Sequence, residues 1–211
     1  MEELSVLPLP HRSSNLSRSM QPLDFDADYY STLDWYGIPE ELRLDCLDCA
    51  HDAVLDGTDA SDIKPFHLHT SDLDRFKSWI GMPNEYVRAG KAAGPGFEAL
   101  SPFDARLAQP DAELSTDERQ DIFLAAGAYL FGDSATVAEY RRAIELRMAP
   151  FEIAVYAARR VILRPTGSLT LSGPPAVLVA GSITLQSGSV LTSKTVSRIL
   201  SDHLVKTEFQ A

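Results

Sequence analysis

Cysteine and positive charge are both scarce in this 211-residue sequence. The only cysteines are Cys46 and Cys49, and two thiols so close together cannot form the disulfide framework of a small secreted domain. Lysine and arginine number 19 against 30 aspartate and glutamate residues, which leaves a net charge of −11. A chain of this sign repels phosphate backbones and anionic lipid headgroups, so we expect no nucleic acid partner and no membrane binding.

Long apolar runs are missing as well. No stretch approaches the roughly 18 consecutive apolar residues of a membrane-spanning helix. The first residues, MEELSVLPLPHRSS, lack the basic start and apolar run of a secretory leader. Hydrophobic residues make up 45% and charged residues 23% of the chain, which is ordinary for a globular protein. These features favour a cytoplasmic protein.

Sequence signatures of common enzyme classes are not found either. The chain has no Gly-x-Ser-x-Gly motif of the kind that presents a nucleophilic serine. The glycines between Gly90 and Gly96 are not followed by the Lys-Ser or Lys-Thr pair of a phosphate-binding loop. The sequence therefore favours a protein without enzymatic activity.

What the sequence does contain is a repeat. Residues 153–194 divide without a gap into six sevens, IAVYAAR, RVILRPT, GSLTLSG, PPAVLVA, GSITLQS and GSVLTSK. The third place of each seven is apolar and holds Val155, Ile162, Leu169, Ala176, Ile183 and Val190. A fixed period indicates repeated units that bury a core only by packing on their neighbours.

Two folds accommodate this period. A strand of about five residues and a corner of about two make one side, and three sides make a coil of about 21 residues in a β-solenoid. Gly167, Gly181 and Gly188 would then lie at corners. The alternative is an antiparallel β-meander with two-residue turns. We favour the solenoid, because stacking explains why the same residue type returns at the same place in each unit.

The remainder of the chain divides into three further parts. Residues 1–23 are rich in proline and serine and predict an extended or disordered arm. Residues 24–142 predict a mainly helical domain, in which Ile38 to Gly57 has apolar residues at helical spacing and Ser115 is positioned to cap a further helix. That helix would bury one apolar stripe, composed of Ile122, Phe123, Ala126, Tyr129 and Leu130.

The C-terminal part completes the predicted fold. Residues 143–194 form the β module, and residues 195–211 predict a capping helix with Val196, Ile199 and Leu204 on one face. An amphipathic helix there would cover the apolar end of the module. The predicted fold class is therefore α+β: a helical N-terminal part, a short β-solenoid and a C-terminal capping helix.

A cluster of cysteine and histidine is a candidate zinc site. Cys46 and Cys49 form a Cys-x-x-Cys pair, and His67 and His69 follow as His-x-His. Thiolates and imidazoles are the ligands that zinc prefers, and a zinc-dependent enzyme is one alternative function. The spacing of the histidines is not that of a typical helical pair, and buried free cysteines are common core residues, so a structural role is the competing interpretation.

Arginines gather near the start of the repeats, in an otherwise acidic chain. They are Arg141, Arg142, Arg147, Arg159 and Arg160. This band would bind an anionic ligand or the acidic part of a partner, or would form ion pairs within the chain.

Residues 168–193 suggest another alternative. They alternate apolar residues with serine, threonine and glycine and contain no charge, as a β-hairpin that enters a membrane would. A pore-forming or membrane-inserting protein would use this segment. Soluble strands show the same alternation, and we instead favour a non-enzymatic binding or oligomerisation protein. Two short coils bury little surface, so self-association into a homo-oligomer, or association with a protein partner, is the expected consequence.

Overall fold

The computed structural model describes residues 6–7, 25–90, 100–110 and 112–207. Its α-helices are α1 (Phe25–Tyr36), α2 (Leu73–Ile80), α3 (Asn84–Arg88), α4 (Thr116–Phe131) and α5 (Arg141–Met148). Short 3-10 helices span Glu40–Leu42, Ala105–Ala108 and Ser134–Tyr140. The strands are β1 (Val6–Leu7), β2 (Arg43–Cys49), β3 (Asp52–Leu55), β4 (Phe66–Thr70), β5 (Phe151–Leu163), β6 (Ser168–Leu171), β7 (Ala176–Gln186), β8 (Val190–Ser193) and β9 (Ser197–Thr207).

The chain forms two compact units. One, the sheet unit, comprises Met1–Leu68 and Ile153–Ala211, and the other, the helical unit, comprises His69–Glu152. The helical unit is thus an insertion between two parts of the sheet unit. Its boundaries do not coincide with those predicted at 23, 142 and 194, and the predicted arm lies outside the described residues except for β1.

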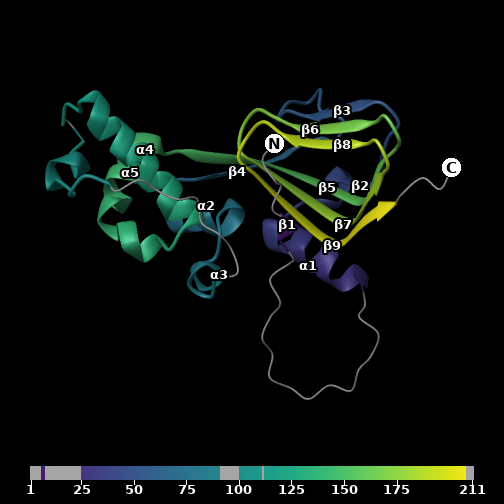
Figure 1. Cartoon of the computed structure of the whole chain (residues 1–211), viewed down its shortest axis with the longest axis horizontal. Coiled ribbons are helices and arrows are strands. Elements are labelled where there is room, and N and C mark those ends of the chain that lie inside the picture. Colours follow the sequence, from purple (N-terminus) through teal and green to yellow (C-terminus); the bar gives the residue numbers. More distant parts are fainter. Residues whose placement is uncertain (1–5, 8–24, 91–99, 111, 208–211) are drawn as a thin grey trace, which may run out of the picture. The chain divides into compact units, whose positions relative to one another are not determined.

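The sheet unit is built from two sheets of parallel strands (Figure 1). The larger sheet has the order β1-β9-β7-β5-β2, with β4 also pairing with β5, and the smaller sheet has the order β3-β6-β8. Ala154 pairs with Ala176, 22 residues on, and Ala176 pairs with Ser197, 21 residues on. The exact seven-residue period is therefore not kept throughout.

Both sheets contribute to one apolar core. Tyr156, Leu178 and Ile199 stand in line on β5, β7 and β9, and they belong to the same buried cluster as Leu169 and Leu171 of the smaller sheet. Helix α1 packs against β7 and β9. This burial of contiguous apolar surface is the main source of stability for the sheet unit.

The predicted fold class is wrong. The protein is a mixed α/β protein in which both sheets take strands from residues 43–55 as well as from residues beyond 150, so residues 143–194 are not a self-contained β-solenoid. The segment from Ile38 to Gly57 forms no α-helix but contains a short 3-10 helix followed by β2 and β3, and the predicted C-terminal capping helix is strand β9. The pairings of β1, β2, β5, β7 and β9, and those of β3, β6 and β8, are parallel, which rules out the antiparallel meander.

A local change in the spacing of inward side chains along the long strands explains the two mistaken helices. In β5, Arg159 and Arg160 are both exposed, between the buried Ala158 and Val161. Inward side chains are therefore three positions apart at this point instead of two, and three is a helical spacing. The same offset in β2 separates Leu44 from Leu47, which pair with Ala158 and Val161.

The helical unit follows its sequence signals more closely. Helix α4 begins after Ser115, whose hydroxyl accepts a hydrogen bond from the Glu118 N–H while the Glu118 carboxylate accepts one from the Ser115 N–H. This reciprocal capping box satisfies two backbone donors at the start of the helix. Among the described residues, none of the helices combines the length and apolarity that crossing a bilayer requires.

Candidate functional site

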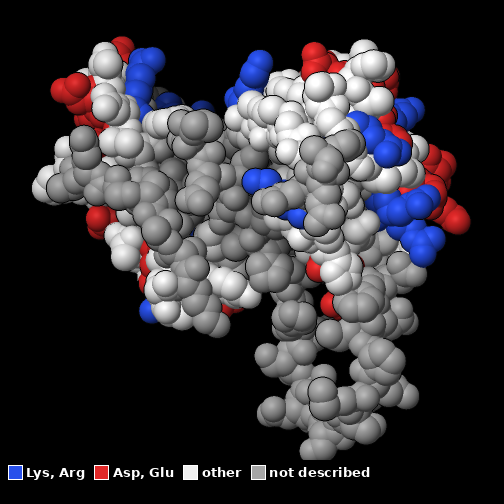
Figure 2. Space-filling model, turned by 45° about the vertical axis from the view of Figure 1, so that its right-hand side comes forward, with Lys and Arg blue, Asp and Glu red and all other residues white. Residues whose placement is uncertain are grey.

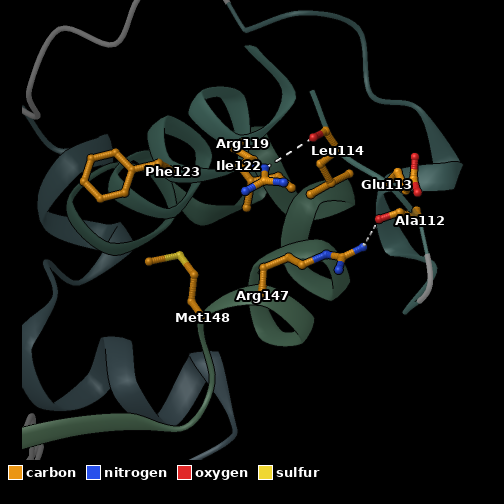
Figure 3. Close-up of a pocket in the computed structure, with 8 residues that line it drawn as sticks. All are labelled: Ala112, Glu113, Leu114, Arg119, Ile122, Phe123, Arg147 and Met148. Carbon is orange, nitrogen blue, oxygen red and sulfur yellow. Dashed lines mark hydrogen bonds between the residues drawn. The ribbon is translucent and has the colours of Figure 1, made fainter. Parts of the chain in front are cut away.

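An open pocket of about 750 Å³ lies in the helical unit (Figure 3). The segment before α4, helix α4 itself and helix α5 supply its lining, which consists of Ala112, Glu113, Leu114, Arg119, Ile122, Phe123, Arg147 and Met148. A volume of this order is within the usual range of small-molecule sites, about 300–1,000 Å³. The pocket is therefore large enough to admit a small organic ligand.

Two arginines of the pocket are held by backbone carbonyl groups. Arg147 donates hydrogen bonds to the carbonyl oxygens of Gln109, Pro110 and Ala112 at 2.8, 3.2 and 3.0 Å. Arg119 donates one to the carbonyl oxygen of Leu114 at 3.3 Å. Carbonyl groups orient a guanidinium without neutralising its charge. Within the described parts of the chain, neither arginine has an ion pair with a carboxylate within 4.0 Å.

Exposed apolar side chains form the other part of the lining. Phe123 on α4 is 68% exposed and Met148 at the end of α5 is 38% exposed. Figure 3 shows these two at one end of the pocket, while Glu113 lies at the opposite end. The prediction that Phe123 belongs to the buried stripe of this helix is wrong, whereas Ile122, Ala126, Tyr129 and Leu130 are buried.

A second candidate site is the edge that β8 and β9 form in the sheet unit, here called the β8–β9 edge (residues 190–193 and 197–207). Leu47, Val161, Ile183 and Leu204 occupy equivalent positions on β2, β5, β7 and β9. The first three are at most 8% exposed, but Leu204 is 48% exposed. Val190 on β8 is 53% exposed, but it stands in line with Ser168 and the exposed Asp52, so it faces outward and not toward the core. This edge therefore presents one core-type side chain, Leu204, that the described residues leave uncovered.

At the opposite edge, formed by β2 and β3, the outer side of β3 is covered by the chain itself. Ile63, from the segment after β3, is buried in the same core cluster as Leu47 and Leu55. The carboxylate of Asp62 accepts a hydrogen bond from the Val54 N–H at 2.7 Å, and the Asp62 N–H donates to the Val54 carbonyl at 3.1 Å. The outer side of β3 thus already has its hydrogen-bond partners.

The predicted zinc ligands lie on two separate strands. Cys46 is partly exposed and Cys49 is buried on β2, and His67 and His69 are on β4. His69 belongs to the helical unit, where its Nδ1 lies 3.9 Å from a carboxylate oxygen of Glu152. Across the described ranges, no three histidine, cysteine, aspartate or glutamate side chains are grouped so that they could hold a metal ion.

Burial determines the chemistry of Cys49. Its side chain is 2% exposed, and burial, followed by the nearby charges of Asp62 and Asp48, raises the pKa of the thiol to about 11. A thiol with such a pKa is protonated at neutral pH and is a poor nucleophile and a poor metal ligand. Cys49 therefore acts in this structure as an apolar core residue.

The predicted arginine band is distributed over both units, and several of its members have acidic partners. Arg141 contacts carboxylate oxygens of Asp72 at 3.2 Å, Asp74 at 2.6 Å and Glu145 at 3.1 Å. Arg160 contacts Asp45 at 2.7 Å. Arg142 and Arg159 are exposed on α5 and β5.

Figure 2 shows basic and acidic side chains intermingled on the visible face rather than gathered into one basic patch. Of the arginines proposed from the sequence, Arg147 alone lines the pocket. Arg119 was not predicted from the sequence, because nothing in its spacing separates it from an ordinary surface arginine of a helix.

Residues 168–193, the segment suggested for membrane insertion, form β6, β7 and β8 of the two sheets. Val177 and Val179 of this segment are completely buried in the protein. No family model, no curated protein and no solved structure matches this chain.

Proposed function

We propose that this protein is a non-enzymatic binding protein that associates with a second copy of itself through the β8–β9 edge. The observation that carries the proposal is the exposure of Leu204, because the side chains at the equivalent positions of β2, β5 and β7 are buried. Leaving apolar side chains in water costs about 25 cal/mol for each Å² of surface, and a second copy would remove that cost.

The backbone of this edge also favours association. β8 is the last strand of its sheet, and the described part of β1 pairs with β9 only at Ile199 and Leu200. Beyond Leu200 the outer N–H and C=O groups of β9 have no strand beside them among the described residues. Such a row of backbone groups pairs readily with another strand, and β1 demonstrates that β9 accepts one.

A closed dimer fits these edges better than an open fibre. A fibre would pair the β8–β9 edge of one copy with the β2–β3 edge of the next, but the segment after β3 already occupies the β3 part of that edge. Lys206 also stands in line with the buried Cys49 and Leu163, so a continued parallel stack would bury its ammonium group. Two copies related by a two-fold axis can keep Lys206 at the rim of the interface.

Both signs of charge are available at this edge. Lys206 is exposed there, Lys194 is exposed directly after β8, and Asp202 is half-buried on the same strand as Lys206. A two-fold interface places each group of one copy opposite the complementary surface of the other, so opposite charges can meet. We include a cytoplasmic location in the proposal, supported by the two free thiols of Cys46 and Cys49.

The test is light scattering coupled to size-exclusion chromatography on the untagged full chain. We expect a mass near twice the 23.1 kDa of one chain. Leu204→Asp should weaken the dimer about 100-fold or more, since it buries an unpaired carboxylate in the interface. Because Leu204 is exposed within one chain, the variant should remain folded by circular dichroism.

Leu44→Asp is the matched control. Leu44 is 37% exposed on β2, at the edge where β3 is already covered, so this variant should remain dimeric. A monomeric wild-type chain, or a dimer that Leu204→Asp leaves intact, would overturn the proposal.

A further inference from the structure

The pocket of the helical unit is a candidate ligand site that does not depend on self-association. Among the described residues, those that line it all belong to that unit, and none of them is part of the β8–β9 edge. The question is which class of ligand its side chains would recognise.

The net positive charge of the pocket favours an anionic ligand. Arg119 and Arg147 supply two positive charges, and Glu113 supplies one negative charge at the end of the pocket that lies away from Phe123 (Figure 3). The carbonyl groups that hold Arg147 fix its guanidinium in place before any ligand arrives. Arg119 donates to the Leu114 carbonyl through its Nε, so its two terminal nitrogens can grip a carboxylate with two parallel hydrogen bonds, while the fixed guanidinium of Arg147 adds a second positive charge.

The rest of the lining favours a ligand that also carries an apolar group. Phe123 and Met148 expose large apolar surfaces, and the buried Ile122 adds a further apolar side chain to the lining. Aromatic rings and flexible methionine side chains adapt well to varied apolar groups. A simple inorganic anion would leave these side chains in water, whereas an apolar group attached to the anion would cover them.

We propose that this pocket binds small amphipathic anions, in which a carboxylate or sulfonate is joined to an aromatic ring or alkyl chain. The anionic group contacts Arg119 and Arg147, and the apolar body lies against Phe123 and Met148. Both parts are needed, because the exposed charges are screened by solvent and the apolar surface is small.

The first experiment uses 8-anilinonaphthalene-1-sulfonate, whose fluorescence rises when its rings leave water. We expect saturable binding that decanoate displaces, whereas acetate and decanol do not, since each lacks one of the two parts. Added salt should weaken binding because it screens the arginine charges. Failure of decanoate to compete, or equal competition by acetate or decanol, would overturn the proposal.

Variants then locate the site. Arg119→Gln and Phe123→Ser should each weaken decanoate binding about tenfold, which corresponds to losing one charge-assisted contact or one apolar contact. Arg142→Gln is the matched control, because Arg142 is an exposed arginine of α5 that does not line the pocket. Leu204→Asp is the second control, since the dye could also bind at the β8–β9 edge.

The outcomes separate this inference from the proposed function. Loss of binding in Arg119→Gln and Phe123→Ser, with Arg142→Gln and Leu204→Asp unchanged, supports the pocket whatever the oligomeric state. Equal loss in Arg119→Gln and Arg142→Gln, or loss in Leu204→Asp alone, would contradict it.

Discussion

At the scale of single residues, the two thiols of this chain have different surroundings although they lie on the same strand. Cys46 is partly exposed, whereas Cys49 is buried in the core of the sheet unit. Burial raises the pKa of Cys49 from 9.0 to about 11, and the carboxylates of Asp62 and Asp48 add to this effect. The Cys-x-x-Cys spacing therefore does not by itself produce a reactive pair here.

A thiol-labelling experiment follows from this difference. At pH 8 we expect Ellman's reagent to react readily with Cys46, while Cys49 reacts only when the sheet unit opens. Cys46→Ser should remove the fast phase and Cys49→Ala the slow one. Equal and fast reaction of both thiols would contradict the structure. If both thiols were protected and a zinc chelator removed that protection, the result would support the zinc site instead.

The same pKa shift predicts a dependence of stability on pH. The folded-state pKa of Cys49 lies above its ordinary value, so the folded chain retains a proton that the unfolded chain loses between about pH 9 and pH 11. This contribution to the free energy of unfolding is complete below pH 9 and is lost as the pH rises to about 11. Denaturant titrations of wild type and Cys49→Ala across this range measure it, and parallel curves for the two proteins would refute it.

At the scale of elements, close approaches between turns and neighbouring strands restrict which residues fit. Gly173, in the connection between β6 and β7, has a φ of +79°, and a Cβ there would lie 2.2 Å from the carbonyl oxygen of Asp56. Both the backbone conformation and the lack of space require glycine at this position. The turn thus fixes how the connection passes over the end of β3.

Substitution of this glycine tests the packing of the connection. Gly173→Ala should lower the free energy of unfolding by about 1–2 kcal/mol for the left-handed backbone and by roughly 1–3 kcal/mol more for the collision. Gly37→Ala is the control, because Gly37 has a φ of +70° but no atom within 4 Å of an added Cβ. Urea unfolding of both variants measures the difference, and equal losses would show that the collision is relieved at no cost.

The helices and strands also show how much of the fold could be predicted from the sequence. The capping box at Ser115 is local, since all its partners lie within one turn, and the helix that it begins was predicted correctly. Strands β2 and β9 depend on pairing with β5 and β7, which are distant in the sequence, so local spacing could not identify them. Inward positions three residues apart within these strands further imitate a helical pattern.

The candidate sites were predictable to a smaller extent. The repeats pointed correctly to strands and to apolar positions such as Leu169 and Ile183, which are buried. The exposure of Leu204 depends on β9 being an edge strand, a property of the sheet order and not of the local sequence. The pocket brings together residues 112–114 and residues 147–148 across α4 and α5, a contact that no single segment encodes.

At the scale of the whole molecule, a net charge of −11 opposes the association of two copies at long range. The β8–β9 edge is less acidic than the chain as a whole, because Lys194 and Lys206 lie beside its exposed apolar side chains. The dimer should therefore become stronger as salt screens the overall repulsion, whereas binding of an anion in the pocket should become weaker.

The most direct test of the dimer is amide hydrogen exchange of the wild-type chain at low and high protein concentration. If two copies meet at the β8–β9 edge, amides of residues 201–207 and of β8 should exchange more slowly at high concentration, because their outer groups become paired or buried. Amides of β2, at the opposite edge, should exchange at the same rate at both concentrations. Exchange from β8 and β9 that is independent of concentration, or protection that appears at β2 instead, would contradict the account.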